Sequence, residues 1–306
     1  MKSIIYQSII KFLNFMPFRN ILAHFLRKMK FLPIDKFYRD FKILGKFQVE
    51  IDSSLCFKMI GYGGGIENET FWKGLFKSWE SDTGWIFKDL VRNEGVIIDI
   101  GANVGIYSLV AKAINPNSIV YAFEPSNSTY PKLVRNNEIN NFDIICKKIA
   151  FSSSNGKAVF YDVPGPNQTS ASLSNLKLKN WAGYDGEIVE YEVDVNTFDS
   201  FVENNDIQQV DLVKIDVEMH EPEVLAGMVA SIDRFKPTII IEVLSDEIGK
   251  QIASRFDDSW NFFFLDKGEK LVKVDRLKYF KHQYPYYFNY LIIHNDKIDD
   301  VKKYMA

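Results

Sequence analysis

The chain has 306 residues, of which 46% are hydrophobic and 25% charged, and its formal net charge is −3. This composition is typical of a globular protein with a large core, and it excludes a disordered or fibrous chain. The two cysteines, Cys56 and Cys146, belong to no C-x-x-C pattern, so they predict neither a zinc site nor a disulfide framework and fit a reducing compartment such as the cytoplasm.

The amino-terminal part differs in charge from the rest. Residues 1–50 contain ten Lys/Arg and three Asp/Glu, a net charge of +7, so the remainder carries −10. Within residues 1–30, apolar residues recur at helical spacing on both sides of Pro17, but no apolar run is long enough to span a bilayer. We therefore predict a basic, amphipathic helical extension over residues 1–45. It either packs on the body or a second subunit, or it contacts the inner face of an anionic membrane.

Residues 46–306 are predicted to form the catalytic domain together with a segment that leads into it. Residues 46–62 alternate apolar and polar side chains around Asp52, which predicts a hairpin. Residues 69–91 are rich in Trp and Phe and predict helices whose aromatic side chains pack in the core.

A buried strand and a ligand-binding turn open the main sheet. Val96–Ile98 is a continuous apolar run that leads to Asp99. Gly101, Asn103 and Gly105 follow, and glycines at a strand-to-helix turn let the backbone approach a ligand closely. This pattern is typical of a nucleotide site.

Strands and helices then alternate, which predicts a mostly parallel α/β sheet. The expected strands are residues 118–123, 144–145, 210–216 and 238–242, and the expected helices are residues 106–114, 128–140, 196–204 and 223–235. Residues 151–195 break this rhythm and predict a loop-and-hairpin insertion near the rim of the site. The closing strands, residues 260–265, 270–274 and 290–294, have little helix between them and predict an antiparallel edge.

Four of the predicted strands end in an acid, namely Asp99, Glu124, Asp216 and Glu242. Ligands of open α/β sheets bind beyond the carboxyl ends of the strands, so we expect these four side chains to line one crevice. Glu124 lies about twenty residues past the glycine turn, where an acid accepts hydrogen bonds from the ribose hydroxyls of a nucleotide.

The turn argues against a dinucleotide such as NAD. A dinucleotide fingerprint needs a middle glycine beside the pyrophosphate, and this chain has Asn103 there. Asp99 also places an anionic group at the turn, which disfavours a pyrophosphate and suits a cationic, sulfonium-bearing ligand. S-adenosylmethionine is such a ligand.

Four motifs occur in one order along the chain. They are D-I-G-A-N-V-G at 99–105, F-E-P at 123–125, V-K-I-D-V-E at 213–218 together with V-L-A-G at 224–227, and I-E at 241–242. Together they closely resemble the FkbM family of S-adenosylmethionine-dependent methyltransferases, from about residue 79 to about residue 294. The resemblance implies the class I methyltransferase (Rossmann-like) fold, whose mostly parallel sheet has seven strands with an antiparallel last strand. It also implies O-methylation, often of sugars in surface glycans or of natural products.

The resemblance assigns cofactor-binding roles to six residues. It implies that Gly101, Asn103 and Gly105 form the turn beneath the cofactor, that Asp99 lies near its methionine end, and that Glu124 binds its ribose. It further implies that Ala150, in the stretch after the third strand, lies against the adenine.

The catalytic candidates are Asp216, Glu218 and His220 after the fourth strand, with Glu242 opposite. Methyl transfer from a sulfonium is an in-line displacement, and a hydroxyl acceptor needs a base to take its proton. We expect the neighbouring acids to raise the pKa of His220, which would make it less available as a base. A structural histidine at a helix start is the alternative. A magnesium ion held by Asp216, Glu218 and Glu242 is a second option for activating the hydroxyl.

One departure from the family pattern lies beside these residues. Met219 stands where the family commonly has a glycine, so the sequence leaves the conformation of this turn open.

The sequence therefore predicts an S-adenosylmethionine-dependent O-methyltransferase that acts on a hydroxyl of a saccharide, surface glycan or glycolipid. A non-catalytic partner protein with the same fold and an NAD-dependent oxidoreductase are the alternatives. Nucleic acid is not an expected partner, because the body is acidic outside the amino-terminal extension.

Overall fold

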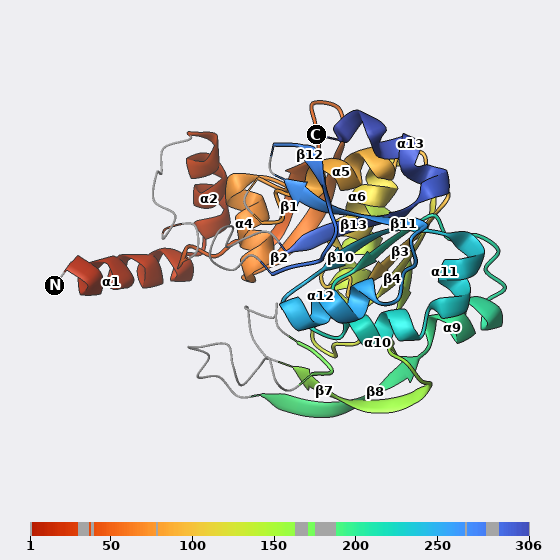
Figure 1. Cartoon of the computed structure of the whole chain (residues 1–306). Coiled ribbons are helices and arrows are strands. Elements are labelled where there is room, and N and C mark those ends of the chain that lie inside the picture. The colour runs from red at the N-terminus through yellow and green to blue at the C-terminus, as the bar shows by residue number, and fades with distance from the viewer. Residues whose placement is uncertain are drawn as a thin grey trace.

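The computed structural model describes residues 2–29, 37, 40–77, 79–162, 171–174, 188–266, 268–279 and 288–305, with side chains from Tyr6 onward. Figure 1 shows a central sheet flanked by helices, a small sheet with β7 and β8 at one end, and two amino-terminal helices beside the body.

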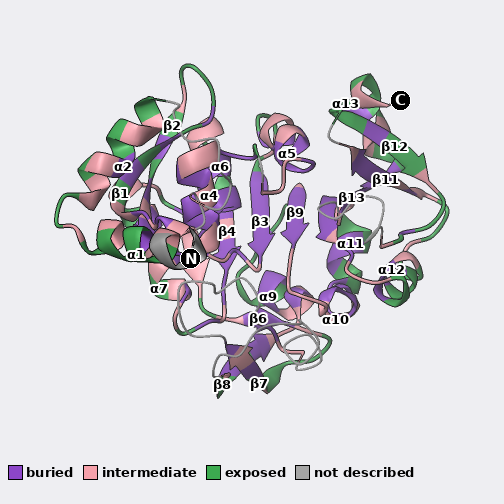
Figure 2. Ribbon diagram, turned by 90° about the vertical axis from the view of Figure 1, so that its left-hand side faces the viewer, coloured by how far each residue is buried: buried purple, intermediate pink, exposed green. Residues whose placement is uncertain are grey.

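The central sheet contains eight strands among the described residues. Their spatial order is β12 (Lys270–Val274), β11 (Trp260–Asp266), β13 (Asn289–His294), β10 (Thr238–Glu242), β9 (Leu212–Ile215), β3 (Val96–Ile100), β4 (Ile119–Phe123) and β5 (Ile145–Lys147). The strands from β5 to β10 pair in parallel, and β13 lies antiparallel between β10 and β11. Every residue of β3 and β9 is buried, as Figure 2 shows for the centre of the sheet, which explains why both strands are apolar apart from Asp99 and Lys214.

This topology confirms the predicted class I methyltransferase fold with an antiparallel last strand. The predicted number of seven strands is wrong, because β12 pairs with β11 and adds an eighth strand at the edge. In this hairpin Asp266 pairs with Lys270, and the outer strand places Val272 and Lys273 in solvent. Charged and exposed residues of this kind are typical of an edge strand.

The helices that follow the strands are α6 (Ile106–Ile114), α7 (Tyr130–Asn140), α9 (Phe198–Asn204), α10 (Glu221–Ala226), α11 (Val229–Phe235) and α12 (Asp246–Ala253). The chain then closes with η1 (Asn295–Lys297), α13 (Ile298–Val301) and η2 (Lys302–Tyr304). The single helix predicted over residues 223–235 is wrong, because the chain breaks into α10 and α11 at Gly227. A Cβ at Gly227 would lie 2.2 Å from the backbone oxygen of Ser152, and the side chain of Asp199 accepts the backbone N–H groups of Ala230 and Ser231 to start α11.

The lead-in consists of a hairpin and two helices. The strands β1 (Leu44–Glu50) and β2 (Cys56–Tyr62) pair antiparallel, and Asp52 accepts backbone hydrogen bonds from Ser54 and Leu55 in the turn. This confirms the predicted hairpin. The helices α4 (Gly65–Lys73) and α5 (Gly84–Leu90) then lead to β3.

The amino-terminal extension contains α1 (Lys2–Phe15) and α2 (Arg19–Lys28). Ile10 and Ala23 are buried in the same apolar core as the β1–β2 hairpin, so this part of the extension packs on the body. Among the described residues, no helix combines the length and apolar character needed to cross a bilayer. A boundary between extension and catalytic domain at residue 45 stays a prediction.

The predicted insertion forms a second, three-stranded sheet. Its strands β6 (Ala150–Phe151), β8 (Val189–Asn196) and β7 (Gly156–Asp162) lie in that order, with β6 and β8 parallel. Residues 163–170 and 175–187 of the insertion lie outside the described residues. Phe160 and Leu173 line the main pocket, so the insertion lies at the rim of the site as expected.

Candidate active site

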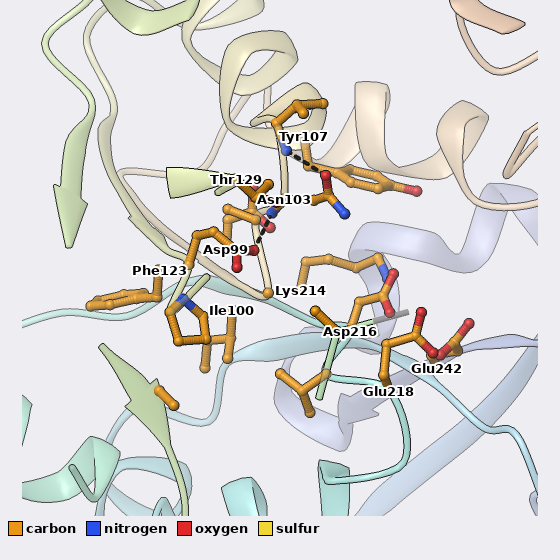
Figure 3. A pocket seen from close by; sticks show the side chains of 18 of the residues that line it. Asp99, Ile100, Asn103, Tyr107, Phe123, Thr129, Lys214, Asp216, Glu218 and Glu242 are labelled. Carbon is orange, nitrogen blue, oxygen red and sulfur yellow. Dashed lines mark hydrogen bonds and ion pairs between the residues drawn. The ribbon is translucent and has the colours of Figure 1, made fainter. Parts of the chain in front are cut away.

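One pocket lies beyond the carboxyl ends of the parallel strands. Its lining includes all four strand-end acids, Asp99, Glu124, Asp216 and Glu242. Figure 3 shows the carboxylates of Asp216, Glu218 and Glu242 and the ammonium group of Lys214 on one side, with Phe123 on the opposite side. Every predicted site residue except Gly105 lines this pocket. The roles assigned to these residues remain predictions.

The turn after β3 requires glycine at its first position. Gly101 has φ +80°, and a Cβ there would lie 1.8 Å from the backbone oxygen of Asp216. The backbone N–H groups of Gly101 and Ala102 both donate to the carbonyl of Phe123, at 3.0 and 2.9 Å. The turn is therefore fixed between the ends of β9 and β4, and no larger residue fits there.

Glu124 is oriented by the backbone of this turn. Asn103, with φ +51°, donates its backbone N–H to Oε2 at 2.9 Å, and Ser126 donates its own to Oε1 at 2.9 Å. Burial raises the pKa of Glu124 to about 7, although the two hydrogen bonds act in the opposite direction. A carboxylate oxygen accepts more than one hydrogen bond, so both oxygens can still receive the hydroxyls of a ribose.

Asp99 and Gly105 hold the start of α6. Oδ2 of Asp99 accepts hydrogen bonds from the backbone N and the Oγ of Ser108, at 3.1 and 2.5 Å, and burial raises the pKa of Asp99 to about 6. Gly105 has φ +91°, and a Cβ there would lie 2.6 Å from a methyl group of Leu133. Gly105 thus packs beneath the turn and does not line the pocket.

One wall of the pocket is apolar. Ala150 and Phe151 line it together with Phe160 of the insertion. The ring of Phe151 meets Phe123 edge to face, with centroids 4.7 Å apart. This apolar slot suits a heterocyclic base.

Lys214 is a site residue that the sequence interpretation missed. It is 1% exposed, and its Nζ lies 3.2 Å from Oδ1 of Asn289 and 3.4 Å from Oδ2 of Asp216. Burial opposes its charge, but the carboxylates of Asp216, Glu80 and Glu242 outweigh burial and raise the pKa of Lys214. A lysine in the middle of a buried strand, two residues before a strand-end acid and on the same side, was the available signal.

Glu80 and Tyr107 were missed as well. Tyr107 donates its hydroxyl to Oε2 of Glu80, and its ring lies 5.3 Å from the ammonium group of Lys214. Burial raises the pKa of Glu80 well above its usual value, and Lys214 opposes that shift. Trp79 also lines the pocket, so one of the aromatic residues predicted to pack in the core faces the site. Trp79 and Glu80 precede the first motif by about twenty residues, and no local pattern marks either of them or Tyr107.

The loop after β9 takes an unusual backbone conformation. Glu218 and Met219 have φ +60° and +75°, and Oε1 of Glu221 accepts the backbone N–H of Met219 at 3.2 Å. Ser172 of the insertion donates its hydroxyl to the carbonyl of Glu218 at 2.9 Å. Met219 therefore keeps the left-handed conformation that a glycine would adopt, at a cost of about 1–2 kcal/mol.

His220 lies at the start of α10 without capping it through its side chain. Its Nε2 lies 3.0 Å from Oγ of Ser152, and its Nδ1 lies 3.8 Å from a carboxylate oxygen of Glu223. Burial lowers the pKa of His220, and the nearby Glu223 only partly opposes this shift. The expectation that acids raise its pKa is wrong, because loss of solvent outweighs their attraction.

The predicted magnesium option finds no support in the geometry. Within the described part of the chain, no group of three or more His, Cys, Asp or Glu side chains is arranged to hold a metal ion. Oδ2 of Asp216 instead faces the ammonium group of Lys214.

Comparison with known proteins decides the family. The sequence profile of the Methyltransferase FkbM domain matches residues 99–271, which is more than half of the chain. The chain belongs to the FkbM methyltransferase family. S-adenosylmethionine is the cofactor of this family, and the turn, the oriented carboxylate of Glu124 and the apolar slot fit its adenosyl group.

Individual proteins that match this chain share less than 30% of their residues with it over the matched part. The chain is 26% identical to hexuronic acid methyltransferase AglP of Haloferax volcanii over 179 residues. This match covers 57% of this chain and 66% of AglP. It is 29% identical to Methyltransferase 1 of Beauveria bassiana over 147 residues. That match covers 44% of this chain and 59% of the relative. The match thus spans less than two thirds of either relative. The crystal structure of the FkbM methyltransferase of Methylobacillus flagellatus KT superposes with a TM-score of 0.42 at 15% identity, over 66% of this chain and 44% of that one.

Proposed function

We propose that this protein transfers a methyl group from S-adenosylmethionine to a hydroxyl oxygen of a saccharide, in a surface glycan or a glycolipid. The observation that carries the proposal is the carboxylate of Glu124, held by two backbone N–H groups beside a turn that admits no Cβ at Gly101. A saccharide acceptor is supported by the similarity to AglP, a hexuronic acid methyltransferase.

The chain's own residues would bind and orient the reactants. When bound, S-adenosylmethionine supplies an electrophilic methyl group on a sulfonium. Glu124 would fix the ribose and the apolar slot would fix the adenine, so that the methyl group faces the acceptor end of the pocket. The carboxyl groups of Asp216 and Glu242 line the pocket beside Lys214, and they would place negative charge around the sulfonium.

The acceptor hydroxyl must lose its proton as its oxygen bonds to the methyl carbon. The electron pair of the broken carbon–sulfur bond stays on sulfur, and the proton passes to a base. His220 suits this role because its lowered pKa leaves the imidazole neutral near pH 7, and Asp216, Glu218 and Glu242 are the alternatives.

Cofactor binding is tested by calorimetry with S-adenosylmethionine. We expect the wild type to bind, Glu124→Ala to lose binding, and Glu247→Ala on the exposed face of α12 to bind normally. Tight binding of NAD and none of S-adenosylmethionine would favour the oxidoreductase instead.

Methyl transfer is tested with labelled S-adenosylmethionine and glycan fractions of the host. Cofactor binding without transfer to any fraction would support a non-catalytic partner.

The base is tested by comparing His220→Gln with Asp216→Asn. If His220 takes the proton, its substitution lowers kcat by about 100-fold or more, leaves cofactor affinity unchanged, and removes the acid limb of the pH profile. If only Asp216→Asn has this effect, the carboxylate is the base. Retained activity in excess chelator would argue against the magnesium option.

We also propose a cytoplasmic location. Cys56 is exposed and Cys146 is half-buried, and both are free thiols, which fits a reducing compartment. Labelling of both thiols in protein extracted from the host under non-reducing conditions would agree with this location. Blocked thiols would contradict it.

A further inference from the structure

The amino-terminal helices α1 and α2 present one face to the body. Ile10 and Ala23 are 7% and 2% exposed on this inner face. Asn14 accepts the backbone N–H of Lys42 at 3.1 Å, and Asn20 accepts that of the first residue of β1 at 3.3 Å. These contacts fix the helices to the body, and Figure 1 shows α1 extending outward from it.

The opposite face of both helices, here called the outer face, is apolar and exposed. Its members are Ile9, Phe12, Phe15, Phe18, Ile21, Phe25 and Met29. Among the described residues thirteen large apolar side chains are exposed, and these seven include every exposed phenylalanine. Phe15 is 89% exposed, whereas the exposed valines of the body are at most 50% exposed. An aromatic surface this open to water typically marks an interaction site.

The charge around the outer face has one sign. Residues 1–34 contain six Lys/Arg and no Asp/Glu. Lys11 on α1 and Lys28 on α2 are exposed beside the apolar residues. Helices with basic and aromatic side chains combined in this way lie in the interface of an anionic bilayer, because apolar burial and charge attraction add.

We propose that the outer face of α1 and α2 docks on an anionic phospholipid membrane. A second copy of the chain is a poorer occupant, because two identical basic faces repel each other. The remainder of the chain carries −10, so anionic lipid attracts the extension and repels the body. The charge pattern thus selects both the surface and the orientation.

Only one helix, α4, would lie between the docked helix α2 and the pocket. On α2 the ring of His24 meets Phe71 of α4 edge to face, and the guanidinium of Arg27 lies 5.0 Å from the Phe71 ring. The same α4 places Ile66 in the pocket wall. If the proposed methyl transfer holds, this arrangement favours an acceptor anchored in the same membrane. Docking itself does not depend on that reaction.

Flotation of the full chain with vesicles tests the proposal. We expect binding to vesicles of phosphatidylcholine with phosphatidylglycerol, weak binding to phosphatidylcholine alone, and loss of binding at high salt. Substituting Phe12, Phe15 and Phe18 together by Ser should abolish flotation. The pair Lys11→Gln and Lys28→Gln should weaken it by about 30-fold, since each lysine near an anionic surface contributes about fivefold.

The matched control replaces exposed apolar residues of the body, Val229→Ser with Val272→Ser, and should float like the wild type. Circular dichroism and thermal unfolding report whether each variant is folded, without reference to cofactor or activity. Equal flotation of the triple Phe variant would overturn the proposal. A dimer in solution that the Phe variant dissociates, without vesicle binding by the wild type, would also overturn it, in favour of a second copy.

Discussion

At the proposed cofactor end of the pocket, backbone groups hold the side chain of Glu124, whereas at the proposed acceptor end Lys214 and buried carboxyl groups hold one another. Glu124 rests on two backbone N–H groups contributed by residues near it in the chain or in the adjacent turn. Lys214 instead depends on Asn289, Asp216 and Tyr107, which come from three separate segments. From this difference we expect the part of the pocket around Glu124 to be sensitive to changes of the backbone, and the part around Lys214 to be sensitive to changes of charge.

The largest effect is expected for Gly101→Ala, which tests the backbone half of the comparison. The new Cβ would overlap the carbonyl of Asp216, and the residue would also have to keep φ +80°. We expect a loss of more than about 4 kcal/mol in the free energy of unfolding, measured with urea. Gly65→Ala is the control, because a Cβ there meets no atom within 4 Å, and it should change stability by less than about 1 kcal/mol. Wild-type stability of Gly101→Ala would contradict the backbone argument.

The second largest effect is expected for Lys214→Met, which tests the role of buried charge in the comparison. Lys214→Met would leave the buried carboxylates around it without a cation and should cost about 3–5 kcal/mol. Lys112→Met is the control, because Lys112 is also buried but its partner Asp143 is largely exposed, so its loss should cost less. Lys214 opposes the rise in the pKa values of Glu80 and Asp99, so without it these two carboxyls should keep their protons to higher pH, which NMR titration of the two groups measures. Unchanged titration of both carboxyls would mean that Lys214 does not control these charges.

A third, intermediate effect is the pH dependence at the cofactor end. Glu124 has a pKa of about 7 in the folded protein and an ordinary value of 4.5. Ribose hydroxyls donate to the ionised form, so the affinity for S-adenosylmethionine should rise by up to about tenfold per pH unit below pH 7 and then level off. Calorimetry between pH 5.5 and 8 measures this, and Glu124→Gln should show a flat profile. A slope retained in that variant would assign the titration to another group.

The raised pKa of Glu124 makes the free energy of unfolding fall with pH, whereas it makes the cofactor affinity rise with pH. Because the unfolded chain ionises Glu124 first, it binds fewer protons than the folded protein between pH 4.5 and about 7. The contribution of Glu124 to the free energy of unfolding therefore falls as pH rises through this window. Denaturant titrations of the wild type and Glu124→Gln should diverge there and run parallel above it.

The smallest effect is expected for Met219→Gly, in the loop after β9 that carries Glu218 and His220. Relief of the left-handed strain should roughly balance the lost packing and the greater freedom of glycine in the unfolded chain, for a net change within about 1 kcal/mol. Val217→Gly is the comparison, because its backbone is not among the positive-φ residues, and it should cost about 2 kcal/mol. Equal costs for both variants would show that Met219 is not strained.

The sequence by itself predicted the parallel strands of the sheet and the residues of the proposed cofactor end. The apolar run at β3, the glycine turn, and the acid about twenty residues later are local patterns, and each follows from a nearby backbone requirement. For this reason Asp99, Gly101, Asn103 and Glu124 could be predicted to share one site before the fold was known, and the described pocket contains all four.

The tertiary structure alone decided the acceptor end. Glu80 and Lys214 lie far apart in the chain, and only the docking of the lead-in on the sheet brings them together. The helix break at Gly227 follows from the approach of Ser152, which no local spacing reveals. The pKa of His220 falls because of burial, while the sequence shows only its acidic neighbours. Local propensity and spacing are encoded within a few residues, whereas desolvation and charge balance depend on which distant segments pack together.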